Sequence, residues 1–117
     1  MQFYGYDKCS TCRAAKRFLQ SLGKPFEEID ITTQPPSQAL LSGVLAAGDY
    51  TIKDLFNRSG EMYRSMKLRE KIPAMSQAQL LALLASHGRL IKRPIIVDGA
   101  RATVGFDEAR MRQVWGA

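Results

Sequence analysis

The spacing of apolar residues changes twice along this 117-residue chain, and these changes constrain its fold more than any other feature. Residues 3–6 form a short aromatic run that is typical of a strand. Through residues 15–22 the apolar positions then recur every three or four residues, which indicates an amphipathic helix. A second strand is expected over residues 26–31, after a glycine and a proline that end the helix. The beginning of the chain therefore predicts a β-α-β unit.

The middle of the chain, from about residue 36 to residue 87, has helical spacing throughout. Several residues mark where individual helices begin or end: capping boxes at Thr51 with Asp54 and at Ser76 with Gln79, a cap at Ser59, and a stop at Gly88. Short polar segments separate these signals. This stretch is therefore expected to be a run of short helices.

After this helical stretch the spacing becomes strand-like again. Residues 95–97 and 102–104 read as two strands joined at the hairpin signal Asp98-Gly99, and Asp107 is placed to cap a last helix. The outer parts of the chain together resemble a thioredoxin-like sheet with helices on both faces. We therefore predict an α/β fold in one domain, residues 1–117, in which residues 1–34 and 89–117 form the core and residues 35–88 form a helical insertion.

Length and composition exclude several classes of protein. A chain of 117 residues suffices for one domain. Its longest apolar stretch, residues 80–85, is far shorter than the roughly 18 residues that a membrane helix needs, and no secretory signal precedes the first strand, so a cytoplasmic location without membrane contact is expected. The net charge of +6 favours anionic partners. No nucleic-acid-binding motif accompanies it, so direct nucleic-acid binding is not expected.

Cys9 and Cys12 are the two cysteines of the chain and carry its most informative chemistry. A loop this short makes a disulfide a poor structural staple, so the pair suggests catalysis, regulation or metal binding. A zinc site needs two further ligands, and beyond the cysteines only His87 and carboxylates remain. Cys9 lies where a strand meets a helix N-terminus, which favours a thiolate. We therefore predict no metal, with Cys9 as the attacking thiol and Cys12 as the resolving thiol.

Arg58 and Pro94 have two interpretations each, whereas His87 has one. Arg58 presents a planar fork suited to oxyanions, although a solvated surface arginine is the commoner case. Pro94 either starts a strand in the ordinary way or follows a cis peptide bond. His87 lies at the end of a predicted helix, where an imidazolium complements the helix dipole, and is interpreted as a terminal residue with no catalytic role.

Four segments together resemble the ArsC/Spx family, which includes glutaredoxin-linked arsenate reductases and the Spx transcription regulators. The segments are residues 5–16 around the cysteines, 57–60, 91–98 and 104–108. The resemblance extends over essentially the whole chain. It implies a thioredoxin-like fold with a helical insertion, in agreement with the pattern of apolar residues.

The resemblance also implies roles for individual residues. Cys9 matches the nucleophilic cysteine, Arg58 and Arg93 match oxyanion-binding arginines, and Pro94 matches a cis-proline beside the active site. The sequence departs from classical arsenate reductases in two ways. Phe106 stands where they have a third arginine, and Cys12 adds a second cysteine that they lack.

These features predict a thiol-dependent oxidoreductase that uses Cys9 and Cys12 to reduce an oxyanion, such as arsenate, or a disulfide. No bound cofactor is expected, and either thioredoxin or glutathione with glutaredoxin would supply electrons. The same residues would also serve a general glutathione-dependent thiol reductase. The alternative is an Spx-like redox-sensing regulator that binds the RNA polymerase α subunit, for which Gly48 falls near the Spx region that contacts polymerase.

Overall fold

The computed structural model describes residues 1–116, and the strands and helices follow the predicted order. Within these residues one sheet contains four strands: β1 (Gln2–Gly5), β2 (Glu27–Asp30), β3 (Ile95–Asp98) and β4 (Arg101–Val104). The order across the sheet is β2-β1-β3-β4. β1 runs parallel to β2, as a crossover through a helix requires, and antiparallel to β3.

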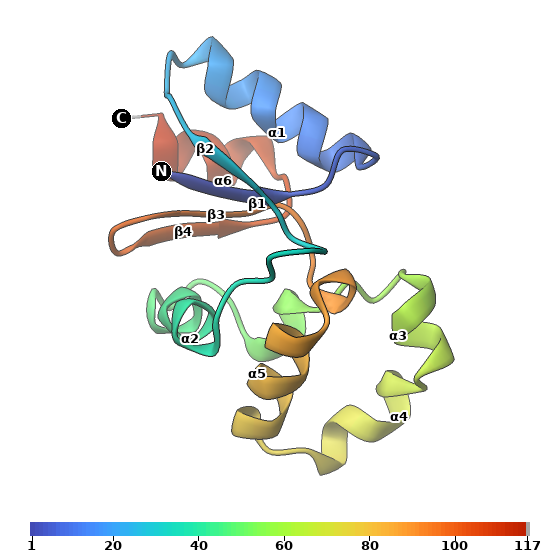
Figure 1. Ribbon diagram of the computed structural model, residues 1–117. Coiled ribbons are helices and arrows are strands. Elements are labelled where there is room, and N and C mark those ends of the chain that lie inside the picture. The colour runs from blue at the N-terminus through green and yellow to red at the C-terminus, as the bar shows by residue number, and fades with distance from the viewer. Residues whose placement is uncertain (117) are drawn as a thin grey trace.

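Helices cover both faces of this sheet (Figure 1). α1 (Ser10–Ser21) and α6 (Glu108–Trp115) lie on one face, and the helices between β2 and β3 lie on the other. Successive strand residues face opposite sides. Phe3 and Ile96 therefore pack with α1 and α6, whereas Tyr4 and Ile95 pack with the other helices. The predicted α/β fold, with helices on both faces of the sheet, is confirmed.

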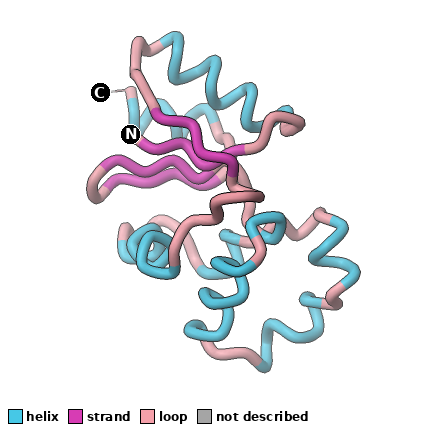
Figure 2. The backbone as a smooth tube through the Cα atoms, in the orientation of Figure 1, coloured by secondary structure: helices cyan, strands magenta, loops and turns pink. Residues whose placement is uncertain are grey.

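The segment between β2 and β3 is a succession of short helices joined by loops, which Figure 2 shows in pink. Its elements are α2 (Gln38–Ala46), η1 (Ile52–Leu55), α3 (Glu61–Ser65), α4 (Leu68–Lys71), η2 (Ile72–Ala74), α5 (Gln77–Ser86) and η3 (Gly88–Leu90), where η denotes a 3-10 helix. Their apolar side chains form one cluster with Tyr4 and Ile95 of the sheet. Across residues 1–116, no helix has the length and apolar character needed to cross a membrane.

The predicted helix signals in this segment are partly right. Capping boxes form at Thr51 before η1 and at Ser76 before α5. The prediction for Ser59 was wrong, because Gly60 is the residue that precedes α3, and the Ser59 hydroxyl donates instead to Asn57 Oδ1 at 3.3 Å. The predicted stop at Gly88 is in the right place, because Ser86 is the last residue of α5, His87 is its C-cap, and Gly88 begins η3.

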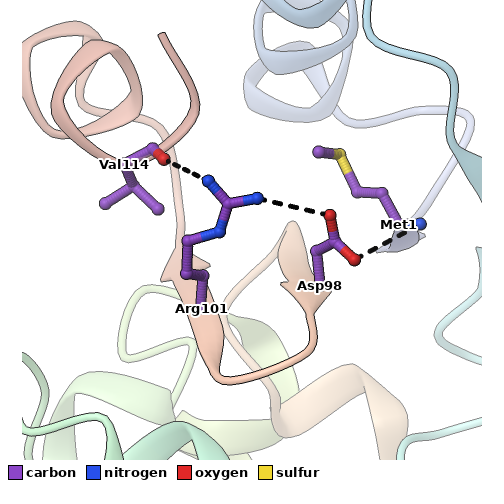
Figure 3. Close-up of polar contacts among 4 residues, drawn as sticks. All are labelled: Met1, Asp98, Arg101 and Val114. Atoms are coloured by element: carbon purple, nitrogen blue, oxygen red, sulfur yellow. Dashed lines mark hydrogen bonds and ion pairs between the residues drawn. The ribbon is translucent and has the colours of Figure 1, made fainter. Parts of the chain in front are cut away.

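Arg101 ties the β3–β4 hairpin to the end of α6 (Figure 3). Its guanidinium donates to the Val114 carbonyl at 3.2 Å, and it lies 3.5 Å from the carboxylate of Asp98, which faces the Met1 amino group. Beneath it, Trp115 is fully buried and donates its indole N–H to Thr103 Oγ1 at 3.0 Å. These contacts hold α6 against β4.

Gly88 is where η3 meets the end of β2. A Cβ placed on Gly88 would lie 1.8 Å from the carbonyl oxygen of Ile31, so only glycine allows this approach. The contact is between segments 57 residues apart in the chain. It sets Arg89, the next residue, near the turn that follows β2.

We predict that Gly88→Ala destabilises the fold by about 1–3 kcal/mol, because the backbone at Ile31 must move to admit a methyl group. Gly43→Ala is the matched control. Gly43 is exposed in the middle of α2 with open space around it, so alanine should stabilise the helix by about 0.5–1 kcal/mol. Chemical denaturation of both variants tests this. Equal free energies of unfolding for the two variants would contradict the packing argument.

Candidate active site

Cys9 is the N-cap residue of α1, and its side chain lies at the open end of the helix. Its Sγ accepts a hydrogen bond from the Cys12 backbone N–H at 3.2 Å, and its own N–H donates to the Tyr6 carbonyl. Backbone N–H groups in the first turn of a helix have no partner within the helix. A sulfur at this position therefore sits next to partial positive charge, which favours its anionic form.

Cys12 lies one turn further along α1 and points into the protein. Its side chain is fully buried and belongs to the apolar cluster that includes Phe3 and Ile96. Gly5 backs this position, since a Cβ there would lie 2.5 Å from the Phe3 ring and 3.4 Å from Cys12 Sγ. The pair is therefore asymmetric, with Cys9 partly accessible and Cys12 enclosed.

Arg93 and Pro94 approach Cys9 from the start of β3. The peptide bond between them is cis, and the Pro94 carbonyl accepts a hydrogen bond from Gly105 N–H at 2.9 Å. The Arg93 guanidinium carbon lies 5.2 Å from the centre of the Tyr6 ring, a cation–π distance that holds the charge beside the thiol.

The two thiols have opposite pKa shifts. Burial of Cys9 disfavours its thiolate, but hydrogen bonds from the Cys12 thiol and backbone, together with the Arg93 guanidinium, outweigh it and lower the pKa of Cys9. Burial and the adjacent Cys9 sulfur raise the pKa of Cys12 to about 12. Cys9 is therefore the thiol that ionises more readily, and Cys12 is the thiol that holds its proton more tightly.

A cavity of about 390 Å³ opens beside Cys9 and is lined by Cys9, Thr11, Asn57, Ser59, Gly60, Lys92 and Arg93. Residues 55–57 and 90–92 build it by pairing as short extended segments. Asn57 N–H donates to the Leu90 carbonyl and Lys92 N–H to the Leu55 carbonyl, each at 2.7 Å. Two cations thus line the space in front of the sulfur.

Sequence reasoning missed Lys92 and Asn57 as residues of this cavity. Lys92 directly precedes Arg93, so two adjacent basic residues before a proline were a signal that was available. Asn57 gave no comparable signal, because its position depends on the pairing with Leu90.

The structure brings Cys9, Cys12, Arg93 and Pro94 together but does not bring Arg58 into the same cavity. Arg58 is exposed and lines a separate hollow with Lys53 and Arg69. Its assignment to the oxyanion stays a prediction from the resemblance. Phe106 packs edge-on against Phe18, with ring centres 6.2 Å apart, so this position is part of the apolar cluster under α1.

His87 is exposed at the end of α5, as its interpretation as a helix-terminal residue expects. Across residues 1–116, no three His, Cys, Asp or Glu side chains gather as metal ligands would.

Comparison with known proteins identifies the family. The model of the ArsC family matches residues 4–114. The chain belongs to the ArsC family. This ArsC-family chain is 45% identical to YusI of Bacillus subtilis, an uncharacterized protein, over 98% of both chains. It is 31% identical to the global transcriptional regulator Spx of Streptococcus pneumoniae, over 89% of this chain and 77% of Spx.

A solved structure supports the same assignment. It is a possible arsenate reductase from Streptococcus mutans, 40% identical to this ArsC-family chain. The two superpose with a TM-score of 0.83 over 90% of this chain and 89% of the other. Relatives of this chain therefore include both named regulators and possible reductases.

We predict that alkylation of Cys9 by iodoacetamide follows a titration whose midpoint lies below the ordinary thiol pKa of 9.0. A lowered pKa means that the thiolate persists as the pH falls, and the rate is lost only below the folded-state pKa. Arg93→Met should move the midpoint upward, because it removes a cation and hydrogen bond from the thiolate. Arg17→Met, which removes an exposed charge on α1, is the control. Coincident titrations of wild type and Arg93→Met would contradict the role of Arg93.

Proposed function

We propose that this chain is a thiol-dependent oxidoreductase in which Cys9 attacks the substrate and Cys12 resolves the product. The observation that carries the proposal is the asymmetric pair: an accessible Cys9 sulfur at the N-terminus of α1, and a buried Cys12 one turn behind it. A purely structural pair of thiols does not require a cation-lined cavity. Here Lys92 and Arg93 line the space in front of Cys9.

With arsenate as substrate, the Cys9 thiolate forms a sulfur–arsenic bond and an oxygen of arsenate leaves as water after taking up protons. The Cys12 thiolate then attacks Cys9 Sγ. The sulfur–arsenic bond breaks, its electron pair reduces arsenic(V) to arsenic(III), and arsenite leaves as the Cys9–Cys12 disulfide forms. Lys92 and Arg93 would bind the oxyanion and stabilise its charge during the attack. Arg58 lines a separate hollow, so Lys92 and Arg93 are the residues proposed to bind the anion.

The first step also prepares the second. The negative Cys9 sulfur and its hydrogen bond are two of the causes that raise the pKa of Cys12. Once Cys9 is bonded to the substrate it carries no charge, and both causes are removed. Cys12 therefore ionises more easily after the first step than before it, which orders the two steps.

A disulfide substrate would use the same two thiols, and the closed Cys9–Cys12 disulfide must then be reduced. We propose that thioredoxin, or glutathione with glutaredoxin, returns the two electrons, so that no cofactor needs to stay bound.

We expect arsenate or a model disulfide, 2-hydroxyethyl disulfide, to drive NADPH consumption in a coupled assay. Thioredoxin with its reductase, and glutathione with glutaredoxin and its reductase, are supplied in parallel. Cys9→Ser should reduce turnover to the rate without protein, because a serine hydroxyl does not ionise at the pH at which the Cys9 thiol does. Arg93→Met should lower arsenate kcat/KM by about 100-fold, the usual loss for one donor to a developing oxyanion, and Arg17→Met should leave it unchanged. Substantial turnover by Cys9→Ser would overturn the mechanism.

The second candidate function is a redox-sensing regulator that binds the RNA polymerase α subunit. The 31% identity to Spx favours it. So does the turn after α2, where Gly48 has a φ of +89° and Arg110 of α6 holds the neighbouring Asp49 at 3.3 Å. Gly48 and Asp49 are exposed, and the ion pair with Arg110 links this turn to α6, so the turn is available for contact with a partner.

If the chain is such a regulator, the oxidised protein should bind the purified α subunit and the reduced protein should bind it at least several-fold more weakly. The variant Cys9→Ser, which cannot form the disulfide, should behave as the reduced protein. Calorimetric titration of the three forms tests this. Equal binding, or none by any form, would remove redox-controlled polymerase binding as a function.

A further inference from the structure

Arg93 also lines a second cavity, of about 360 Å³, whose walls do not include Cys9. Tyr6, Thr32, Glu61, Ser65 and Arg89 line it as well. Because Arg93 is a wall of both cavities, a ligand in the second cavity is next to the group that faces the reactive sulfur. The second cavity therefore belongs to the neighbourhood of the active site but not to the reacting centre.

Three parts of the fold meet to form this cavity. The close approach of Gly88 to Ile31 brings Arg89 of η3 to Thr32, and α3 packs against η3 and supplies Glu61. Tyr6 follows β1 and lies under the Arg93 guanidinium, at 5.2 Å. The cavity is thus set by contacts between distant segments, and its position relative to Cys9 is fixed by Arg93.

The cavity carries charges of both signs. Glu61 and Arg89 both line it, and neither forms an ion pair with another side chain in the described part of the chain. The Ser65 hydroxyl donates to the Met62 carbonyl and can still accept. A carboxylate, two guanidinium groups and hydroxyls around one space complement a ligand that carries a carboxylate and an ammonium together.

We infer that the second cavity binds the α-amino acid head group of a small disulfide substrate, with Arg89 and Arg93 on its carboxylate and Glu61 on its ammonium group. This rests on the proposed function and names the class of substrate. The Cys9 cavity would then hold the disulfide sulfurs, and the head group would orient them for attack.

The reaction balances with the two protein thiols alone. The Cys9 thiolate attacks one sulfur of the substrate disulfide, the substrate S–S bond breaks, and the leaving thiolate takes up a proton. Cys12 then loses its proton and attacks Cys9 Sγ, which closes the Cys9–Cys12 disulfide and releases the second thiol. One substrate disulfide becomes two thiols, and the protein dithiol becomes a disulfide.

The test measures how fast five disulfides oxidise the reduced protein in a single turnover. Cystine and homocystine carry the complete head group, cystamine carries only ammonium groups, 3,3′-dithiodipropionate carries only carboxylates, and 2-hydroxyethyl disulfide is neutral. Each rate constant is divided by that for the same disulfide with dithiothreitol, which removes differences in intrinsic reactivity. Cystine or homocystine should then react at least about fivefold faster than the neutral disulfide, as two partly exposed ion pairs allow.

Charge variants show whether this preference comes from the second cavity. Glu61→Gln should slow the reaction of the disulfides with ammonium groups by roughly two- to fivefold and leave that of 3,3′-dithiodipropionate unchanged. Arg89→Gln should slow the disulfides with carboxylates by a similar factor and leave cystamine unchanged. Glu70→Gln and Arg17→Gln make the same change of net charge at exposed positions outside the cavity and are the controls.

Each outcome decides the inference. A preference for the complete head group that falls only in the cavity variants supports it. Equal normalised rates for all five disulfides, or identical effects of cavity and control variants, overturn it and leave the thiol mechanism standing. If none of the five disulfides oxidises Cys9, the proposed disulfide chemistry fails and this inference fails with it.

Discussion

A short pairing between residues 55–57 and 90–92 sets the geometry on which the site depends. Two hydrogen bonds of 2.7 Å and a bridge between Phe56 and Ile91 join the chain just after η1 to the end of the helical segment. Directly after this pairing the chain reaches Arg93 and β3. The turn at residues 57–60 and the cations at 92 and 93 are therefore held side by side, although more than 30 residues separate them in sequence. Without this pairing, the turn at residues 57–60 would not line the cavity beside Cys9.

The fold gives the two cysteines different environments with very little structure. Cys9 lies at the helix cap, where its sulfur meets backbone N–H groups and Arg93. Cys12, three residues further along, lies in the apolar layer between α1 and the sheet. Helical geometry alone supplies this difference, since one turn separates the solvent side of a cap from the buried face. The remaining helices and strands exclude solvent from Cys12 and hold Lys92 and Arg93 in place.

The features that the sequence predicted well depend on neighbours in the chain. The strand-to-helix junction at Cys9 and the capping boxes at Thr51 and Ser76 are local patterns, and they form as expected. The features that the sequence did not predict depend on distant contacts. The stop at Gly88 was predicted in the right place, but the lack of a side chain there also serves the approach of Ile31. Likewise, Asn57 and Arg58 are adjacent, yet only the pairing with residue 90 decides which of them faces Cys9.

The position of Arg93 as a wall shared by two cavities has a thermodynamic consequence. In the proposed reaction the charge on Cys9 disappears when the disulfide forms, so the Arg93 guanidinium would face a different electrostatic partner in each redox state. An anion in the second cavity that prefers one of these states must shift the reduction potential of the Cys9–Cys12 couple by the same free energy, because coupling between two sites is reciprocal. With such a ligand bound, the reduction potential of the proposed Cys9–Cys12 couple would depend on the ligand as well as on the two sulfurs.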